Sequence, residues 1–136
     1  MDTLNRWQPF ALLVMRLVLG GIMIAHGYQK VFGGFHTHQQ MVGSLGMPMW
    51  MAYLSTGTEF FGGIAIVLGV LTRFFSLAFV IEMAVAIAKV HFKNGLKGPG
   101  GYEFPLALAT LAFALIFFGG GPFAFDFARG GGKKGK

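Results

Sequence analysis

The sequence predicts an all-α fold: a polytopic membrane protein built as a four-transmembrane-helix bundle. Three observations carry this prediction. Hydrophobic residues make up 54% of the 136-residue chain, charged residues make up only 12%, and four apolar stretches have roughly the length of a membrane-crossing helix. A soluble helical protein would need more polar surface than a mean hydropathy of +0.63 leaves. Backbone groups in lipid must be satisfied internally, so we expect helices rather than strands.

The four stretches follow one another along most of the chain. The first two, Pro9 to Val31 and Met49 to Leu71, each reach the length of about 20 residues that spans a bilayer. Between them, residues 33–47 carry apolar side chains at helical spacing, which favours a short interfacial helix. The third stretch, Phe74 to Phe92, is followed by GLKGPGG, which cannot continue a helix and predicts a loop. The fourth, Phe104 to Phe118, is the shortest.

The chain is predicted to form one membrane domain over residues 1–128, followed by a disordered basic tail over residues 129–136. Four spans place both termini on the same side. The basic residues expected on that side are Arg6, Arg73, Arg129, Lys133, Lys134 and Lys136, and those expected on the other side are Lys30, Lys93 and Lys97, with Lys89 nearby. The positive-inside rule then predicts cytoplasmic termini. In a bacterium, where we expect the protein in the inner membrane, the opposite face would be periplasmic.

Composition also excludes several classes of function. The sequence contains no cysteine, which excludes disulfides, thiolate nucleophiles and iron–sulfur ligation within this chain. The net charge of +6 does not indicate nucleic-acid binding, because the cations lie near helix ends and in the tail, with no soluble module to present them. The lipid bilayer is the partner that fits them better.

Three ionisable residues fall inside the apolar stretches: Arg16, Glu59 and Glu82. Arg16 and Glu82 lie about 10 and 12 Å from the same membrane face at a rise of about 1.5 Å per residue, so we predict an ion pair between them. Glu59 would share Arg16 or remain protonated. On each helix, polar and small residues occupy one face, which places the charges inside the bundle. A functional pocket and a purely structural polar network remain equally open.

A second polar cluster is predicted toward the periplasmic side. Its members are His26, Lys30, Lys89, His91 and Glu103. His26 and His91 could bind a haem axially, but two histidines are a weak haem signal, and hydrogen-bonding and interfacial roles are favoured. His36 and His38 lie close in sequence without an evident third ligand, so no metal site is predicted.

Three segments carry a resemblance to a known family: RLVLGGIMIAHGYQKVFGGF, TEFFGGIAIVLGVLTRFFSLAFVIEMAVAIAKVHFKNG and GGYEFPLALATLAFALIFFGGGPFAFD. They resemble the successive signatures of the DoxX family of bacterial four-helix membrane proteins, and the likeness covers nearly the whole chain except the tail. Phe125 departs from the pattern, which usually has a serine before Asp126. The family's motif positions correspond to Arg16, His26, Gly27, Lys30, Glu59, Gly62, Gly63, Gly69, Thr72, Arg73, Glu82, His91, Gly101, Tyr102, Glu103 and Asp126.

The resemblance implies a membrane subunit or anchor of a redox assembly, either quinone-linked or acting in oxidant defence. No self-contained catalytic centre is seen, so the chain would be at most a subunit of a quinone-linked oxidoreductase. It has no intrinsic cofactor motif, and a bound quinone is the cofactor expected, with electrons exchanged through a redox partner protein. One alternative is a small transporter for a quinone-like or other small solute, and another is a purely structural membrane protein. Glycine-rich helix faces would also allow a homo-oligomer.

Overall fold

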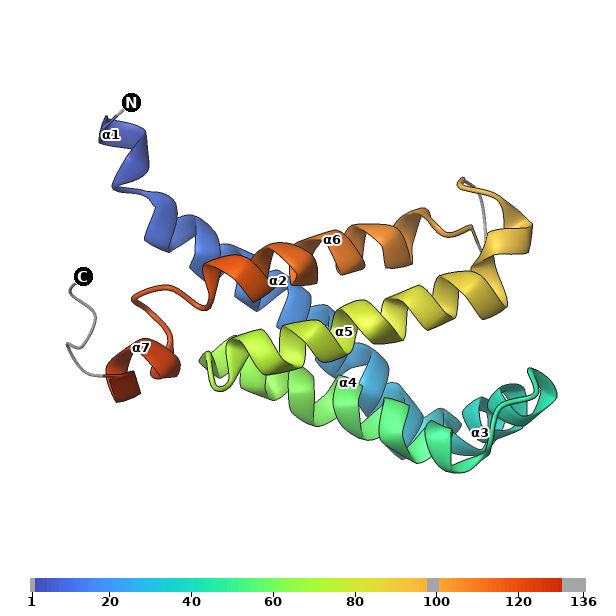
Figure 1. Ribbon diagram of the computed structural model, residues 1–136. Coiled ribbons are helices and arrows are strands. Elements are labelled where there is room, and N and C mark those ends of the chain that lie inside the picture. The colour runs from blue at the N-terminus through green and yellow to red at the C-terminus, as the bar shows by residue number, and fades with distance from the viewer. Residues whose placement is uncertain (1, 98–100, 131–136) are drawn as a thin grey trace.

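The computed structural model describes residues 2–97 and 101–130, and within those ranges all regular structure is helical. Four long helices form a bundle (Figure 1), which confirms the predicted all-α class. The elements in order are α1 (Asp2–Asn5), α2 (Gln8–Gln29), the π-helical segment η1 (Lys30–Gly34), α3 (Phe35–Ser44), α4 (Trp50–Leu68), α5 (Thr72–Ala86), the π-helical segment η2 (Ile87–His91), the 3-10 turn η3 (Phe92–Asn94), α6 (Glu103–Phe118) and α7 (Phe125–Gly130).

The bundle has two distinct ends. The terminal end consists of α1, α7 and the turn between α4 and α5, whereas the α3 end consists of α3, η3 and the start of α6 (Figure 1). The first and last described residues, Asp2 and Gly130, therefore lie at one end, as four spans require. Which side of the membrane that end faces stays a prediction.

The helices have the length and composition of membrane spans. Three continuous helical segments qualify: Gln8–Ser44 with 37 residues, Trp50–Leu68 with 19 and Thr72–Asn94 with 23. Helix α6, with 16 residues, is shorter, as the sequence predicts. Large apolar side chains face outward, including Phe61 at 66% and Phe117 at 64% exposure. Such an outer surface suits lipid rather than water.

Local sequence accounts for the helix boundaries. Pro9 stands in the first turn of α2, where a missing N–H costs nothing. Gly69 ends α4 in the left-handed conformation with φ +79°, which a residue without a Cβ adopts readily. Residues 95–97 leave the helical path, as the predicted loop requires, and residues 98–100 of that loop lie outside the described ranges.

The helices pack as two pairs, α2 with α4 and α5 with α6. Glycine permits the close approach of the first pair: a Cβ on Gly27 would lie 2.6 Å from the backbone nitrogen of Phe60. The hydrophobic core between the pairs includes Leu19, Met23, Ile66, Phe79, Leu108, Ala112 and Leu115. The faces predicted from polar and small residues hold, since Arg16, Gly20 and Glu59 are all buried.

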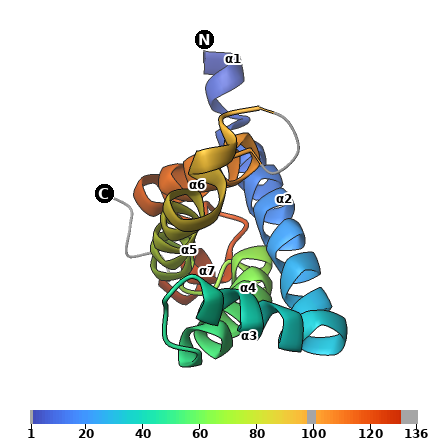
Figure 2. The ribbon, with the colours of Figure 1, turned by 90° about the vertical axis from the view of Figure 1, so that its right-hand side faces the viewer.

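Helix α3 crosses one end of the bundle in front of α4 (Figure 2). This is the short helix that the spacing of residues 33–47 predicts. Its inner face buries His38 and Val42, which retain 9% and 4% of their exposure. Helix α3 therefore belongs to the packed structure and borders the interior of the α3 end.

Helix α7 is not predicted from the sequence. It begins at Phe125 and ends at Gly130, so the first two residues of the predicted tail are helical. Residues 131–136, the remainder of that tail, lie outside the described ranges. The backbone of Asp126 donates to the carbonyl of Gly69 over 2.9 Å, which ties α7 to the end of α4.

Candidate functional site

A cavity of about 890 Å³ opens in the α3 half of the bundle, bordered by α2, η1, α3, α4, α5, η2 and α6. Most of its wall is apolar, and flexible methionine side chains are prominent there: Met23, Met41, Met47, Met51 and Met83. Methionine adapts its shape to different apolar partners. A cavity of this size and lining can enclose a small amphipathic molecule.

Four polar residues from three elements meet on the wall of this cavity. Lys30 Nζ donates to Glu59 Oε1 over 2.9 Å and to Glu59 Oε2 over 2.8 Å. The Ser55 hydroxyl lies 2.8 Å from Glu82 Oε2 and 3.4 Å from Glu59 Oε2. We call Lys30, Ser55, Glu59 and Glu82 the polar cluster. It places two carboxyl groups side by side with one ammonium.

The helices dictate where the cluster forms. Ser55 and Glu59 are four residues apart on α4 and therefore share one face. Lys30 is the first residue of η1, directly after α2, where the close α2–α4 contact at Gly27 brings it to Glu59. The side chain of Glu59 is 5% exposed and that of Lys30 is 24% exposed, so the carboxylate is more deeply buried than the ammonium that binds it.

The predicted ion pair between Arg16 and Glu82 is wrong. Arg16 instead donates to backbone carbonyls: Nε to Ile66 over 3.0 Å, one terminal nitrogen to Val67 over 2.6 Å and the other to Gly120 over 3.3 Å. Glu82 belongs to the polar cluster, so the expected network of Arg16, Glu59 and Glu82 is split in two. The last carbonyls of a helix lack partners from the following turn of that helix. A guanidinium has five N–H donors, so it can bind several such carbonyls at once.

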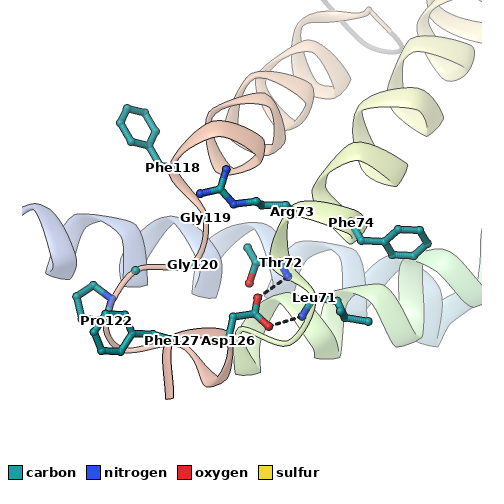
Figure 3. Close-up of a pocket in the computed structure, with 11 residues that line it drawn as sticks. Leu71, Thr72, Arg73, Phe74, Phe118, Gly119, Gly120, Pro122, Asp126 and Phe127 are labelled. Atoms are coloured by element: carbon teal, nitrogen blue, oxygen red, sulfur yellow. Dashed lines mark hydrogen bonds between the residues drawn. The ribbon is translucent and has the colours of Figure 1, made fainter. Parts of the chain in front are cut away.

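The terminal end uses its other charges in the same way. Arg73 donates to the carbonyls of Ile116 and Phe117 at the end of α6, over 2.8 and 3.1 Å. The carboxylate of Asp126 accepts from the backbone N–H groups of Leu71 and Thr72, each over 2.8 Å (Figure 3). We call Arg16, Arg73 and Asp126 the capping group, because each satisfies backbone groups at a helix end.

Capping by Asp126 coincides with backbone strain. Leu71 has φ +48°, a left-handed conformation that is unfavourable for a bulky residue. The two hydrogen bonds that the Asp126 carboxylate accepts stabilise this turn and the first residues of α5. A second cavity of about 460 Å³ lies beside it, lined by Thr72, Phe118, Gly119 and Pro122 among others (Figure 3). The charged groups lining it, Arg73 and Asp126, are already bound to backbone groups.

Comparison with known proteins identifies the family. The sequence profile of the DoxX family matches residues 11–92, from the start of α2 through η2 and including the whole polar cluster. The chain belongs to the DoxX family. The resemblance noted in the sequence is thereby confirmed.

Relatives of this DoxX protein match it over nearly their whole length. A Bacillus subtilis protein named "Putative oxidoreductase CatD" is 30% identical over 131 residues, covering 94% of this chain and 97% of the relative. An Escherichia coli protein named "Inner membrane protein YqjF" is 29% identical over 126 residues, covering 93% of this chain and 95% of the relative. No solved structure matches the chain.

In this DoxX protein the second predicted cluster surrounds the same cavity. The residues predicted for it, His26, Lys30, Lys89, His91 and Glu103, all contribute to the cavity lining. Lys30 is also a member of the polar cluster, where it forms an ion pair with Glu59. The ring of His26 lies 6.0 Å from that of Phe104 on α6, and both residues border the cavity. The two predicted groups are therefore regrouped around one cavity, without Arg16.

The sequence does not predict two residues of this site, Ser55 and His38. The sequence predicts no metal site at His36 and His38 and gives His38 no other role, yet His38 lies on α3, lines the cavity and is 9% exposed. The apolar spacing of Met41 and Val42, which predicted a helix here, could have placed His38 on its inner face. Within residues 2–97 and 101–130, no group of three or more His, Cys, Asp or Glu side chains is arranged to hold a metal ion.

Proposed function

We propose that this DoxX protein binds a quinone-type ring from the bilayer in the cavity of its α3 half and presents it to a redox partner protein. The observation that carries the proposal is a largely apolar cavity of about 890 Å³ with the polar cluster on its wall. A quinone needs an apolar slot for its ring and hydrogen-bond donors for its carbonyl oxygens. Both are supplied by this chain's own residues.

The donors are identifiable. The Lys30 ammonium has three N–H groups, and its two measured hydrogen bonds go to the Glu59 carboxylate. One N–H therefore remains for a ligand carbonyl. Glu59 fixes the ammonium in place, while the methionine-rich wall accommodates the ring and its substituents. Glu82 and Glu59 would exchange protons with the bound ring when it changes its oxidation state.

An electron-carrying partner is part of the proposal. The sequence contains no cysteine for thiol or iron–sulfur chemistry, and most of its length lies in apolar helices. The word "oxidoreductase" in the printed name of the Bacillus subtilis relative supports a redox setting. The role of this chain would be to bind and orient the ring, while the partner donates or accepts electrons.

We place the protein in the bacterial inner membrane with its terminal end in the cytoplasm. The name of the Escherichia coli relative supports the location, and the predominance of basic residues at the terminal side supports the orientation. The cavity would then open toward the periplasmic half of the bilayer.

A small-solute transporter is the second candidate, and the buried carboxyl groups of Glu59 and Glu82 favour it. Carboxyl groups inside a membrane protein commonly couple transport to protons. The two candidates differ in one observable: a transporter moves its solute across a sealed vesicle, whereas a quinone-presenting subunit does not.

The first test is purification of the tagged full-length protein in mild detergent, with mass spectrometry of co-purifying proteins and extracted small molecules. The proposal expects quinone in stoichiometric amount, a flavin- or metal-bearing redox protein, or both. The chain with bulk lipid alone would contradict it. Solute flux in reconstituted vesicles would then favour the transporter.

A further inference from the structure

The polar cluster is one positive charge short of neutrality. Two carboxyl groups, Glu59 and Glu82, lie within hydrogen-bonding reach of the same Ser55 hydroxyl. One ammonium faces them, and both of its measured hydrogen bonds go to Glu59. A second carboxylate in an apolar interior is costly unless a positive charge or a proton accompanies it.

Two residues that line this cavity each carry a buried polar atom that receives no hydrogen bond. Glu82 Oε1 and His38 Nε2 are both buried, and neither has a donor among the residues that the structure describes. His38 is 9% exposed, so this nitrogen cannot turn to bulk water. A carboxylate oxygen only accepts hydrogen bonds, and Nε2 accepts them in the tautomer that carries the proton on Nδ1. Together they indicate a ligand that donates hydrogen bonds.

From these observations we propose that the cavity also binds a lipophilic primary amine in its protonated form, in exchange for one proton. The ammonium would donate to Glu82 Oε1 and His38 Nε2, and its apolar body would contact the methionine-rich wall. The proton that the two carboxyl groups share in the empty cavity would leave to water, so the charge stays balanced. This site goes beyond the proposed quinone function, because a quinone is neutral and carries no N–H group.

The other titratable groups around the cavity come from several elements. The other titratable residues that line it are His26 on α2, Lys30 on η1, His38 on α3, Glu59 on α4, Lys89 and His91 on η2 and Glu103 on α6. Lys89 and Glu103 are exposed and of opposite sign, so water screens both and their charges offset. Both hydrogen bonds of Lys30 go to Glu59, so the second negative charge of the polar cluster would be on Glu82.

The aromatic residues of the wall fit the same ligand. Phe74, Phe75 and Phe104 border the cavity, and ring faces attract cations as well as apolar groups. An amine with a single hydrophobic ring would match this lining. A fully hydrated inorganic cation would not, because most of the wall offers no oxygen atoms to replace its water.

The proposal is tested with three probes of the same shape: 4-tert-butylbenzylamine, the corresponding benzyl alcohol and the corresponding trimethylammonium compound. Their binding to the full-length protein in phosphatidylcholine nanodiscs is measured calorimetrically at pH 7 in two buffers of different protonation enthalpy, with empty nanodiscs subtracted.

We expect the primary amine to bind at least about tenfold more tightly than the alcohol. It should release about one proton per molecule, and the alcohol none. The trimethylammonium probe should bind less tightly than the amine, since it donates no hydrogen bond.

Glu82→Gln removes the charge and keeps the shape, so amine affinity should fall about tenfold and proton release should disappear, while alcohol binding stays within about twofold. Asp2→Asn on exposed α1 is the matched acidic control and should bind all probes as the unaltered protein does. Equal affinity for amine and alcohol in the unaltered protein, or amine binding without proton release, would overturn the proposal, and neither readout depends on a variant folding. Duroquinone binding is measured alongside. If duroquinone binds and the amine does not, the proposed quinone function stands and the amine site is rejected. If the amine binds and duroquinone does not, the amine site stands and the quinone function is rejected.

Discussion

The two ends of the bundle use buried charge for different purposes. At the terminal end, the capping group binds backbone: Arg16 satisfies carbonyls of α4 and of the segment after α6, and Asp126 satisfies N–H groups at the start of α5. In the α3 half, the polar cluster binds itself, and its members face a cavity. An ionisable residue inside a membrane protein is thus a functional candidate only after its partners are known.

The comparison predicts which charges the fold requires. Capping residues should control stability with little effect on ligand binding, whereas polar-cluster residues should control binding at a smaller cost in stability. Four perturbations examine this division, beginning with the one expected to have the largest effect.

Arg16→Met should lower the free energy of unfolding by about 3–5 kcal/mol, because it removes three hydrogen bonds from a buried guanidinium to the carbonyls of Ile66, Val67 and Gly120. Unfolding in detergent titrated with sodium dodecyl sulfate measures this loss. Arg16→Lys should recover only part of it, since one ammonium cannot reproduce the planar fork of the guanidinium. The losses from Arg16→Met and Glu82→Gln should add within about 0.5 kcal/mol, and a larger coupling would restore the ion pair that the structure rejects.

Gly27→Ala should cost about 1–3 kcal/mol, because its Cβ would meet the backbone of Phe60, whose nitrogen lies 2.6 Å from that position. It should also loosen the Lys30–Glu59 contact, since Gly27 brings α2 against α4 beside it. Gly21→Ala is the matched control: nothing lies within 4 Å of that Cβ position, so its stability should stay the same or rise slightly. Equal losses at both sites would contradict the close packing of α2 on α4.

Lys30→Met, Glu59→Gln and the double variant form a thermodynamic cycle for the ion pair. The coupling should be about 1–2 kcal/mol, below that of a fully buried pair, because the Lys30 side chain is 24% exposed. The double variant should be more stable than either single variant, as it leaves no charge alone in the interior. The same detergent titration measures the coupling free energy. Zero coupling would contradict a stabilising interaction between Lys30 and Glu59.

Asp126→Ala should cost about 1 kcal/mol through the loss of the N-terminal cap of α5. Asp126→Asn should retain most of that stability, because an amide oxygen also caps a helix. Thermal unfolding of both variants decides the point. A loss as large in Asn as in Ala would mean that Asp126 acts by its charge on Arg16 rather than as a cap.

Much of the fold follows from the sequence because each helix carries its own signal. Apolar length predicts the spans, and the polar and small residues on α2 and α4 predict which faces are buried. The spacing near Val42 predicts α3. Helix α7 has no such signal: it is short, and its role depends on Asp126 reaching Leu71 and Thr72, far away in the sequence.

The candidate site was harder to predict, because two residues at the same depth in the membrane need not lie on helix faces that contact each other. Arg16 and Glu82 were placed at one level by counting residues, yet α2 packs mainly on α4, and the last carbonyls of α4 lie nearer to Arg16. Lys30 was assigned to the outer cluster for the same reason. A lysine side chain extends far enough along a helix to reach Glu59, and simple level counting ignores that reach.

The central claim is that the polar cluster serves a ligand and the capping group serves the fold. Equilibrium binding of duroquinone to the protein in nanodiscs tests it most directly, with the Lys30→Met/Glu59→Gln double variant compared against Asp126→Asn. The account predicts that the double variant remains folded but binds about tenfold less tightly, while Asp126→Asn binds within about twofold of the unaltered protein. Binding that is unchanged in the double variant and lost in Asp126→Asn would contradict it.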